Sequence, residues 1–505
     1  MSLVQPELQP EVSPFKRSPS ELEDYLETSG EDCLILLDLD ETLFLRNSTE
    51  EYLNTLKPRI LGAILLILLD VLRPWNFLPG NLKGEVSRDW LRVIISTLIF
   101  PWTMLFWQGE AKKLAELYSN SQLVKMLAQK PKSAIVITTL GFNLIVDPLI
   151  KHLPLEVSGT VACRFWRGGV DRVKGKYQLV VDQLGEEKVA QAIAITDSPN
   201  DNPLLAAVAE PYLVTWPGAE YVPALSDTYI PFFYLERIKR PGEKYFLRVI
   251  LADDWLVLIF ATSWISPVPV LHAGMVLFFL LSFWCIYEVG YLENDRVAEQ
   301  FEKSPTLSNT YSIYKREMKW QQPWIWAAIL AIPGLFLLNS IQSQFFLEYF
   351  TNPMTIPVIS VTLWIALLVL VRISFWVYNY IDKQTRTWLY LILQAYKTFG
   401  FLLLTSTNIV GTLLFSAQVL SRWICYLTYR YAHKDWLNLP GELLRCLIFS
   451  FLLMAIAVGT RDVHVFWNGQ AFVIFIWCLY RGRLQLLSIL NQAHCIHQER
   501  WEVKP

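Results

Sequence analysis

Residues 33–42 read Cys-Leu-Ile-Leu-Leu-Asp-Leu-Asp-Glu-Thr, an apolar run that ends in two aspartates. A run of four to six apolar residues is typical of a strand buried on both faces of a sheet. Two similar runs follow, 134–137 before a pair of threonines and 192–195 before Thr196 and Asp197. Helical patterns lie between the runs, and this alternation predicts an open, parallel α/β sheet. The ligand crevice of such a sheet lies at the carboxyl ends of its strands.

A long insertion separates the first two predicted strands, at about residues 45–130. It holds two apolar stretches, at 60–69 and 90–107. The first is too short to span a bilayer, and Pro101 interrupts the second. We expect either an interfacial or re-entrant hairpin or a plain helical cap packed on the sheet domain.

The composition changes at about residue 246. The whole chain has 505 residues, of which 53% are hydrophobic and 18% are charged, and its net charge is −2. Residues 1–246 hold 25 Lys and Arg against 31 Asp and Glu, whereas residues 247–505 hold 19 against 15. A single soluble globule is therefore not expected. The near-neutral net charge gives no support for a nucleic-acid partner.

The second half contains about eight segments of membrane-spanning length. Basic residues gather in the connections after the second, fourth, sixth and eighth segments, which predicts that these connections and both termini are cytosolic. We expect no secretory signal, because the polar N-terminal stretch has no apolar core. These features predict an integral protein of the cell (inner) membrane. The eight segments lie at 248–266, 268–290, 323–342, 354–376, 387–404, 405–421, 441–460 and 463–480.

These patterns divide the chain into four predicted parts. They are a polar tail at 1–30, an α/β domain at 31–240, an all-α multispan domain at 247–485 and a cytosolic tail at 486–505. Asp253 and Asp254 stand at the start of the first spanning segment, where we expect them at the level of the lipid headgroups. If they lie deeper, they become candidates for function.

The first predicted strand ends in a pair of carboxylates with a clear chemical use. Asp38 and Asp40 can point into one crevice from an extending loop, so that one attacks a phosphoryl group while the other transfers the proton of the leaving group. Carboxylates also suit Mg²⁺, a hard cation that prefers oxygen ligands. Thr139 ends the second strand with a hydroxyl for a phosphate oxygen, and Lys174 opens an amphipathic helix with a positive charge.

Two further carboxylates, Asp197 and Asp201, follow the third predicted strand and can complete a metal site. This ordered set of four motifs resembles the haloacid dehalogenase superfamily of phosphohydrolases, and most closely its phosphoserine-phosphatase-like branch. The resemblance implies a Rossmann-like α/β domain with a helical cap insertion that closes over the substrate.

The resemblance also implies a role for each matching residue. Asp38 would be the nucleophile that forms an aspartyl-phosphate, and Asp40 would be the general acid and base. Thr139 and Lys174 would hold the phosphoryl group. The Mg²⁺ ligands would come from Asp38, the carbonyl of Asp40, Asp197 and Asp201.

Two positions depart from the pattern of that branch. Glu41 stands where glycine is usual, and an anion there could alter the mouth of the site. Thr196 stands where glycine usually precedes the aspartate. Neither change removes a catalytic group.

The membrane half carries a second candidate site. Asn294, Asp295 and Glu302 follow the second segment, and Asn379 and Asp382 follow the fourth. Such residues could hold Mg²⁺ against a diphosphate, or they could mark helix ends at the interface. The first three resemble the NDxxDxxxD segment of UbiA-type polyprenyl-transferases, although the second acid of that segment is missing. That family also occurs fused behind haloacid dehalogenase domains.

The expected function is that of a membrane-anchored, Mg²⁺-dependent phosphohydrolase. Its substrate would be a phosphorylated lipid or lipid-linked metabolite at the cytosolic face, and membrane lipid would be its other partner. Two alternatives stay open. One is a UbiA-like polyprenyl-group transferase with an accessory phosphatase domain, and the other is a non-enzymatic lipid-binding or transport protein with a vestigial domain.

Overall fold

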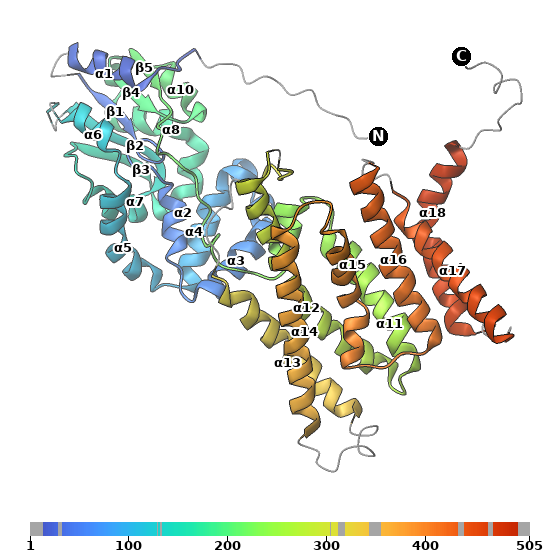
Figure 1. Ribbon diagram of the computed structural model, residues 1–505. Helices are drawn as coiled ribbons and strands as arrows, with labels where there is room; N and C mark the ends of the chain where they lie inside the picture. Colours follow the sequence, from blue (N-terminus) through green and yellow to red (C-terminus); the bar gives the residue numbers. More distant parts are fainter. Residues whose placement is uncertain are drawn as a thin grey trace, which may run out of the picture. The chain divides into compact units, whose positions relative to one another are not determined.

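The computed structural model describes residues 14–28, 33–128, 130–131, 134–303, 305–311, 319–342, 355–432, 439–462 and 468–492. The described residues form two compact units, with the boundary between Ile230 and Pro231 (Figure 1). Residues 231–240, which we expected in the first domain, group with the second unit. Of the two predicted tails, residues 1–13, 29–30 and 493–505 lie outside the described ranges, and the first tail includes the helix α1 (Pro19–Thr28).

The first unit contains a five-stranded parallel sheet in the order β3-β2-β1-β4-β5. The predicted parallel α/β class is confirmed in this form. The strand order reverses at β1, so the topological switch point lies between β1 and β4. The strands are β1 (Ile35–Asp38), β2 (Ile135–Phe142), β3 (Gly159–Cys163), β4 (Ile193–Thr196) and β5 (Glu210–Leu213).

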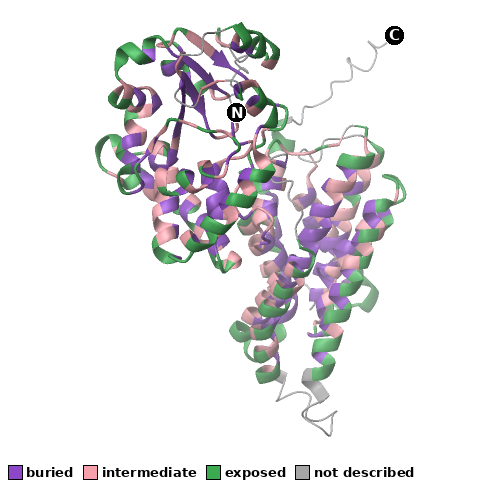
Figure 2. Cartoon of the chain, turned by 90° about the vertical axis from the view of Figure 1, so that its left-hand side faces the viewer, coloured by how far each residue is buried: buried purple, intermediate pink, exposed green. Residues whose placement is uncertain are grey.

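The central strand β1 is buried on both faces, as its uninterrupted apolar sequence predicts. Ile35 and Leu37 belong to the core on one side of the sheet, and Leu36 belongs to the core on the other side. Full burial of each such side chain contributes about 1.5–3 kcal/mol. Figure 2 shows the strands in the colour of buried residues, with exposed positions on the surrounding helices. The sheet therefore holds its central strand end rigidly.

Helices cover the sheet and also form the insertion. Those outside the insertion are α1 (Pro19–Thr28), α7 (Asn143–Ile150), α8 (Gly168–Leu184), α9 (Glu186–Ala190) and α10 (Asn202–Leu205). Those within it are α2 (Ser48–Asn54), α3 (Arg59–Leu72), α4 (Arg88–Ile99), α5 (Thr103–Tyr118) and α6 (Ser121–Leu127), with short helical turns at Pro74–Phe77, Gly80–Leu82 and Glu85–Ser87.

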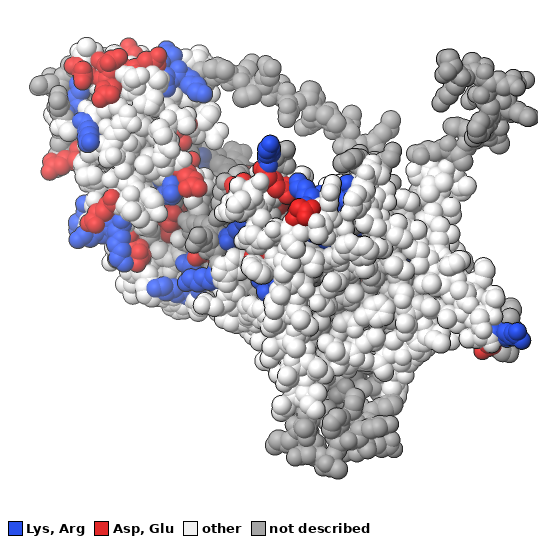
Figure 3. Space-filling model, in the orientation of Figure 1, with Lys and Arg blue, Asp and Glu red and all other residues white. Residues whose placement is uncertain are grey.

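The second unit is helical, and six of its described helices are long and apolar enough to cross a membrane. They correspond to six of the eight predicted segments and support a membrane-spanning second half. On the face shown in Figure 3, the surface over these helices is mostly uncharged. The six are α12 (Pro269–Phe301), α13 (Gln321–Gln342), α14 (Thr355–Tyr380), α16 (Ile409–Tyr431), α17 (Gly441–Thr460) and α18 (Gly469–Gln492).

One predicted span, 387–404, is broken rather than continuous. The helix α15 (Thr387–Tyr396) ends just before Lys397, and a short turn at Phe399–Leu403 follows. Lys397 is buried, and its Nζ lies 3.4 Å from Oδ2 of Asp254. A buried ammonium requires a partner of opposite charge, and this pairing accompanies the break in the helix.

The other predicted span, 248–266, also changes its helix type along its length. A wide π-helical stretch at Phe246–Trp255 leads into α11 (Leu256–Thr262) and a tight turn at Ser263–Ile265. Asp253 in the wide stretch is buried, with Arg422 at 2.5 Å and Arg445 as a second partner. Asp253 and its neighbour Asp254 therefore lie inside the helical unit. Asp253 is paired with arginines of α16 and α17, and Asp254 is paired with Lys397 in the turn after α15.

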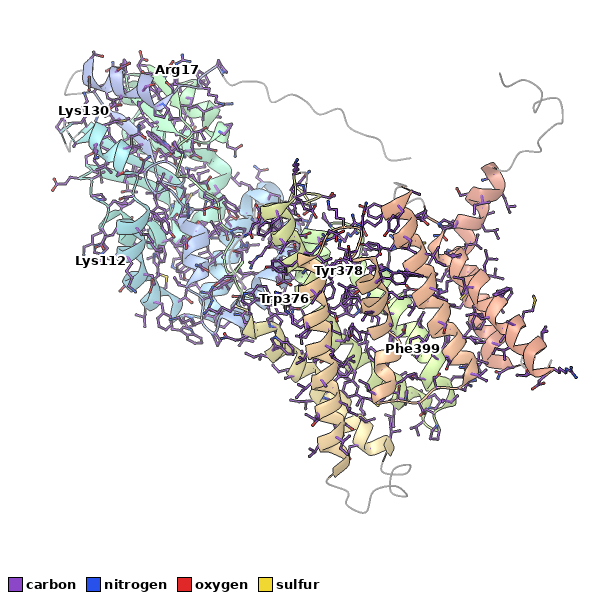
Figure 4. The ribbon with its side chains drawn as sticks, viewed as in Figure 1. Arg17, Lys112, Lys130, Trp376, Tyr378 and Phe399 are labelled. Atoms are coloured by element: carbon purple, nitrogen blue, oxygen red, sulfur yellow. The ribbon has the colours of Figure 1, made fainter. Side chains whose placement is uncertain are left out.

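The long helix α14 illustrates how the second unit separates its surface from its interior. Trp376, labelled in Figure 4, is 56% exposed. Tyr378, two residues later and also labelled, is buried, and its hydroxyl lies 2.8 Å from that of Tyr426. An apolar outer side with a hydrogen-bonded inner side is what a helix in a membrane requires.

Candidate active site

Asp38 ends β1 at the switch point of the sheet and is almost fully buried. Its Oδ1 accepts a hydrogen bond from the Leu39 amide at 2.8 Å and lies 2.8 Å from Nζ of Lys176. Its Oδ2 accepts a hydrogen bond from Oγ1 of Thr196 at 2.7 Å. The carboxylate is therefore held by the amide that follows β1, by Thr196 at the end of β4 and by Lys176 of α8.

The lysine in contact with Asp38 is Lys176, and not the predicted Lys174. Its Nζ lies 2.6 Å from Oδ2 of Asp201 as well as 2.8 Å from Asp38, and the side chain is 8% exposed. Lys174, predicted for this role, is 43% exposed, and its Nζ lies 2.7 Å from Asp182 on the same helix. The structure does not bring Lys174 to the site, and Lys176 takes its place.

The reason for the difference lies at Gly175, between the two lysines. This glycine has φ 81° and ψ 162°, which breaks the helical path inside α8. A positive φ is accessible to glycine at little cost. Because the helical path is interrupted there, Lys176 and not Lys174 opens the regular helical stretch that follows the break.

Asp40 lies between the start of α2 and the strand β2. Its Oδ1 accepts a hydrogen bond from the Ser48 amide at 2.6 Å, and its Oδ2 accepts one from Oγ1 of Thr139 at 3.3 Å. The Thr139 hydroxyl is in turn oriented by the Gly141 amide, which donates to its Oγ1 at 2.9 Å. The structure thus brings Thr139 to Asp40, although Thr139 lies inside β2 and not at its end as predicted.

The carboxylates after β4 complete the cluster. Asp201 is buried, and its Oδ2 lies 2.6 Å from Oγ1 of Thr196, the same hydroxyl that contacts Asp38. Asp197 accepts a hydrogen bond of 3.0 Å from Oγ1 of Thr42. Thr196 is thus a site residue that the sequence analysis recorded only as a departure, although a hydroxyl at a strand end was the available signal.

The cluster holds more negative than positive groups. Burial raises the pKa of Asp38 to about 7, and Asp201 and Asp197 oppose the lowering effect of Lys176. Burial also raises the pKa values of Asp40 and Asp197. Burial alone would lower the pKa of Lys176, but Asp38 and Asp201 hold it above its usual value. The lysine therefore stays charged while the carboxylates lack sufficient counter-charge.

The carboxylate and carbonyl oxygens of this cluster are the kind of ligand that Mg²⁺ prefers. Within the described ranges, no three His, Cys, Asp or Glu side chains form a group arranged to hold a metal ion. Mg²⁺, however, is usually bound through one or two carboxylates, with water and phosphate oxygens completing its shell. Asp38 and Asp197 supply carboxylates whose pKa values burial raises, and Asp40 can supply a backbone carbonyl.

Glu41 adds a strained anion beside the cluster. Its φ is +58°, in the left-handed region that side chains rarely adopt, and its amide donates to the Arg46 carbonyl at 3.2 Å. Burial, with Asp197 and Asp40 nearby, raises the pKa of Glu41 to about 7. The loop therefore retains a conformation suited to glycine while carrying an acidic side chain.

A buried ion pair connects the insertion to the site, and nothing in the sequence pattern singled it out. Arg92 of α4 lies 2.5 Å from Oε1 and 3.3 Å from Oε2 of Glu50 in α2, and both side chains are nearly fully buried. Glu50 also accepts a hydrogen bond from the Tyr221 hydroxyl at 3.1 Å. Because α2 begins at Ser48, which binds Asp40, this pair fixes the helix that orients the proposed acid.

In the membrane unit, two of the predicted acids carry cationic partners. Asp295 accepts a hydrogen bond of 2.6 Å from the Tyr234 hydroxyl and is paired with Lys239. Glu302 lies 2.8 Å from Nζ of Lys383. Both acids are therefore neutralised within the chain.

The remaining membrane candidates fall into two places. Asn294 donates to Asn379 at 3.1 Å, and Asn379 donates to Glu293 at 2.9 Å. Glu293 forms a two-pronged pair with Arg372, at 2.7 and 2.9 Å, which the sequence analysis did not identify. Asp382 instead caps its own turn, where it accepts backbone hydrogen bonds at 2.9 and 3.0 Å.

Comparisons with protein-family models, with curated proteins and with solved structures found no match to this chain. The chemistry of the site therefore rests on its geometry. A buried carboxylate, a second carboxyl with a raised pKa, an ammonium and a fixed hydroxyl lie at one edge of the sheet. This set can attack, protonate and stabilise a tetrahedral anion such as a phosphoryl group.

Proposed function

We propose that this chain is a membrane-anchored, Mg²⁺-dependent phosphohydrolase of the haloacid dehalogenase type. The single observation that carries the proposal is the cluster in which Lys176 joins Asp38 to Asp201 at the switch point of the parallel sheet. Asp40 and Thr139 lie beside it as a hydrogen-bonded pair. Ligands of open α/β sheets bind at this edge.

The reaction proceeds through a covalent intermediate. An Oδ atom of Asp38 attacks phosphorus, the bond from phosphorus to the leaving oxygen breaks, and that oxygen takes the proton of Asp40. Water then attacks the aspartyl-phosphate, and Asp40 accepts the proton of this water. The products are the alcohol, inorganic phosphate and the restored Asp38 carboxylate, so atoms and charge balance.

The environment suits each group to its step. Burial raises the pKa of Asp40, so that it can hold a proton for the leaving group. Lys176 and Thr139 provide an ammonium and a hydroxyl for the oxygens of the transferring group. When bound, Mg²⁺ would supply charge neutralisation between Asp38, Asp197 and the phosphoryl oxygens.

The substrate class follows from where the catalytic unit is tethered. Six helices able to span a membrane continue the same chain, so we infer a substrate that is a phosphorylated lipid or a lipid-linked metabolite. The alternation of basic connections favours the cytosolic face of the cell (inner) membrane. The acids of the membrane unit give no independent support to prenyl transfer, because Asp295 and Glu302 each have a lysine partner.

The test measures Mg²⁺-dependent phosphate release by the full-length protein in vesicles. The substrates form a panel of lipid and water-soluble phosphomonoesters. We expect release from a lipid substrate, with a loss of at least about 10³-fold in Asp38→Asn, because the nucleophile is removed. The matched control is Asp182→Asn, on the exposed side of α8, which should release phosphate as the wild-type protein does. Equal activity of Asp38→Asn and wild type would overturn the proposal.

A further inference from the structure

The corner between α4 and α5 has no part in the chemistry proposed above. The helical stretches Glu85–Ile99 and Thr103–Tyr118 meet there at a bend of 118°. Large apolar side chains are exposed on both sides of the bend. They are Leu98 (62% exposed), Ile99 (48%), Trp102 (42%), Leu105 (72%) and Phe106 (39%).

This corner combines the composition of a membrane segment with a sharp bend. Taken together, the two helical stretches are as long and apolar as a membrane-crossing helix requires, but they turn back at the break. Large apolar side chains that are exposed together on a protein surface mark an interaction site. Amphipathic helices that lie in a membrane interface bury such a face about 5–10 Å into the headgroup and acyl boundary.

A lysine stands at the edge of the corner. Nζ of Lys57 lies 4.3 Å from the centre of the Phe106 ring, and the Lys57 carbonyl accepts a hydrogen bond of 2.7 Å from Nε1 of Trp102. Lysines beside interfacial aromatic residues place their charge at the level of the lipid phosphates. The charge of Lys57 thus complements an anionic headgroup next to the apolar surface.

The apolar character has a clear limit along α5. Beyond the corner this helix becomes charged, with Lys113 3.0 Å from Glu110 and with Lys112 exposed in Figure 4.

The helix α3, which follows Lys57, adds a second exposed apolar stripe. Its members are Leu61 (52% exposed), Leu68 (49%) and Leu72 (63%).

We propose that the corner at residues 98–106 inserts into the interface of the lipid bilayer, with Lys57 at the level of the headgroup phosphates. A bilayer is the occupant because the spanning helices of the same chain keep one within reach and because the corner has the aromatic and basic composition of an interfacial anchor. This inference depends on the membrane-spanning half and not on the phosphatase chemistry.

The test uses a photo-crosslinking residue in the full-length protein, reconstituted in vesicles of phosphatidylcholine and phosphatidylglycerol. Leu105→p-benzoylphenylalanine reports on the corner. Leu117→p-benzoylphenylalanine is the matched control, because this leucine is on the same helix and equally exposed, at 69%. Twelve residues separate the two positions, about 18 Å along a helix, which exceeds the depth of an interfacial insertion.

Mass spectrometry of the irradiated protein distinguishes the outcomes, and loss of the ketone absorbance confirms photolysis in every sample. We expect lipid adducts at position 105 at least about tenfold more abundant than at position 117. Equal yields at both positions, or none at 105, would overturn the proposal. Adducts from 105 to the chain's own helices or to a second copy would also overturn it, because protein would then cover the corner. Phosphate release is not used, so failure here is distinct from failure of the proposed function.

Discussion

Replacing Lys176 with methionine removes the ammonium between two buried carboxylates and keeps most of the volume of the side chain. In the wild-type protein Nζ lies 2.8 Å from Asp38 and 2.6 Å from Asp201. Methionine cannot neutralise either carboxylate, so one of them has to take up a proton or admit water. We expect the variant to lose both stability and phosphate release.

The magnitude follows from the burial of the pair. Removing one partner of a buried ion pair costs about 3–5 kcal/mol. Protonation limits the loss, because the pKa of Asp38 is already about 7, so we expect the lower end, about 3 kcal/mol. In a unit of this size that lowers the thermal midpoint by about 6–12 °C. Loss of the charge that faces the phosphoryl group should lower phosphate release by about 10²–10³-fold.

The burial of Asp38 also determines how the loss of stability in Lys176→Met should change with pH. The pKa of Asp38 is raised in the folded state, so its ionisation opposes folding as the pH rises through about 7. Lys176 offsets this penalty only while the carboxylate is ionised. The destabilisation in Lys176→Met should therefore be larger at pH 8 than at pH 6.

The assay compares Lys176→Met with Lys174→Met in the full-length protein, by thermal unfolding at pH 6 and pH 8 and by Mg²⁺-dependent phosphate release. Lys174 is exposed and paired on the surface of α8, so its replacement should leave both readouts unchanged. If Lys176→Met keeps wild-type activity while Lys174→Met loses it, the assignment of the lysine is refuted.

Three further outcomes are expected. Mg²⁺ should raise the thermal midpoint more at pH 8 than at pH 6. The carboxyl of Asp38 has a pKa of about 7 and is therefore more fully ionised at the higher pH. Equal shifts of the midpoint at the two pH values would contradict this. Glu41→Gly should raise the free energy of unfolding of the first unit by about 1 kcal/mol, since glycine adopts a φ of +58° without strain, and a lower stability in chemical unfolding would count against it. Asp295→Asn should lower the thermal midpoint of the second unit, because Lys239 loses its partner. Phosphate release should stay unchanged, and a loss of phosphate release in this variant would contradict the prediction.

The sheet could be predicted where its strands are buried on both faces. The apolar runs at 33–37, 134–137 and 192–195 correspond to β1, β2 and β4, which carry the site. The outer strands β3 and β5 were not predicted. Each is short and includes half-buried positions, and β5 contains Pro211, so neither shows an uninterrupted apolar run.

The site could be predicted where its residues lie within or at the end of a buried strand, and not where a break in the backbone separates a residue from its neighbours. Asp38 and Thr139 are carried by rigid strands, so their position follows from the sequence. Lys176 lies beyond the break at Gly175, and helical spacing does not extend across a residue with positive φ. The pair between Glu50 and Arg92 joins segments 42 residues apart, and no local pattern indicates such a contact.

In the membrane half, too, local features could be predicted and features that depend on distant residues could not. Length and apolar composition predicted the six long helices, because both properties are local. The interruption at Lys397 depends on Asp254, which is 143 residues away in the chain, so the broken span could not be predicted from its own segment.

Binding of beryllium trifluoride, a mimic of a phosphoryl group on a carboxylate, tests the nucleophile most directly. It needs no knowledge of the natural substrate, and fluorine NMR of the full-length protein reports it. We expect one bound beryllium trifluoride per chain that requires Mg²⁺, is lost in Asp38→Asn and is retained in Asp182→Asn. Absence of binding in the wild-type protein, or binding that survives Asp38→Asn, would contradict the assignment of Asp38 as the phosphoryl acceptor.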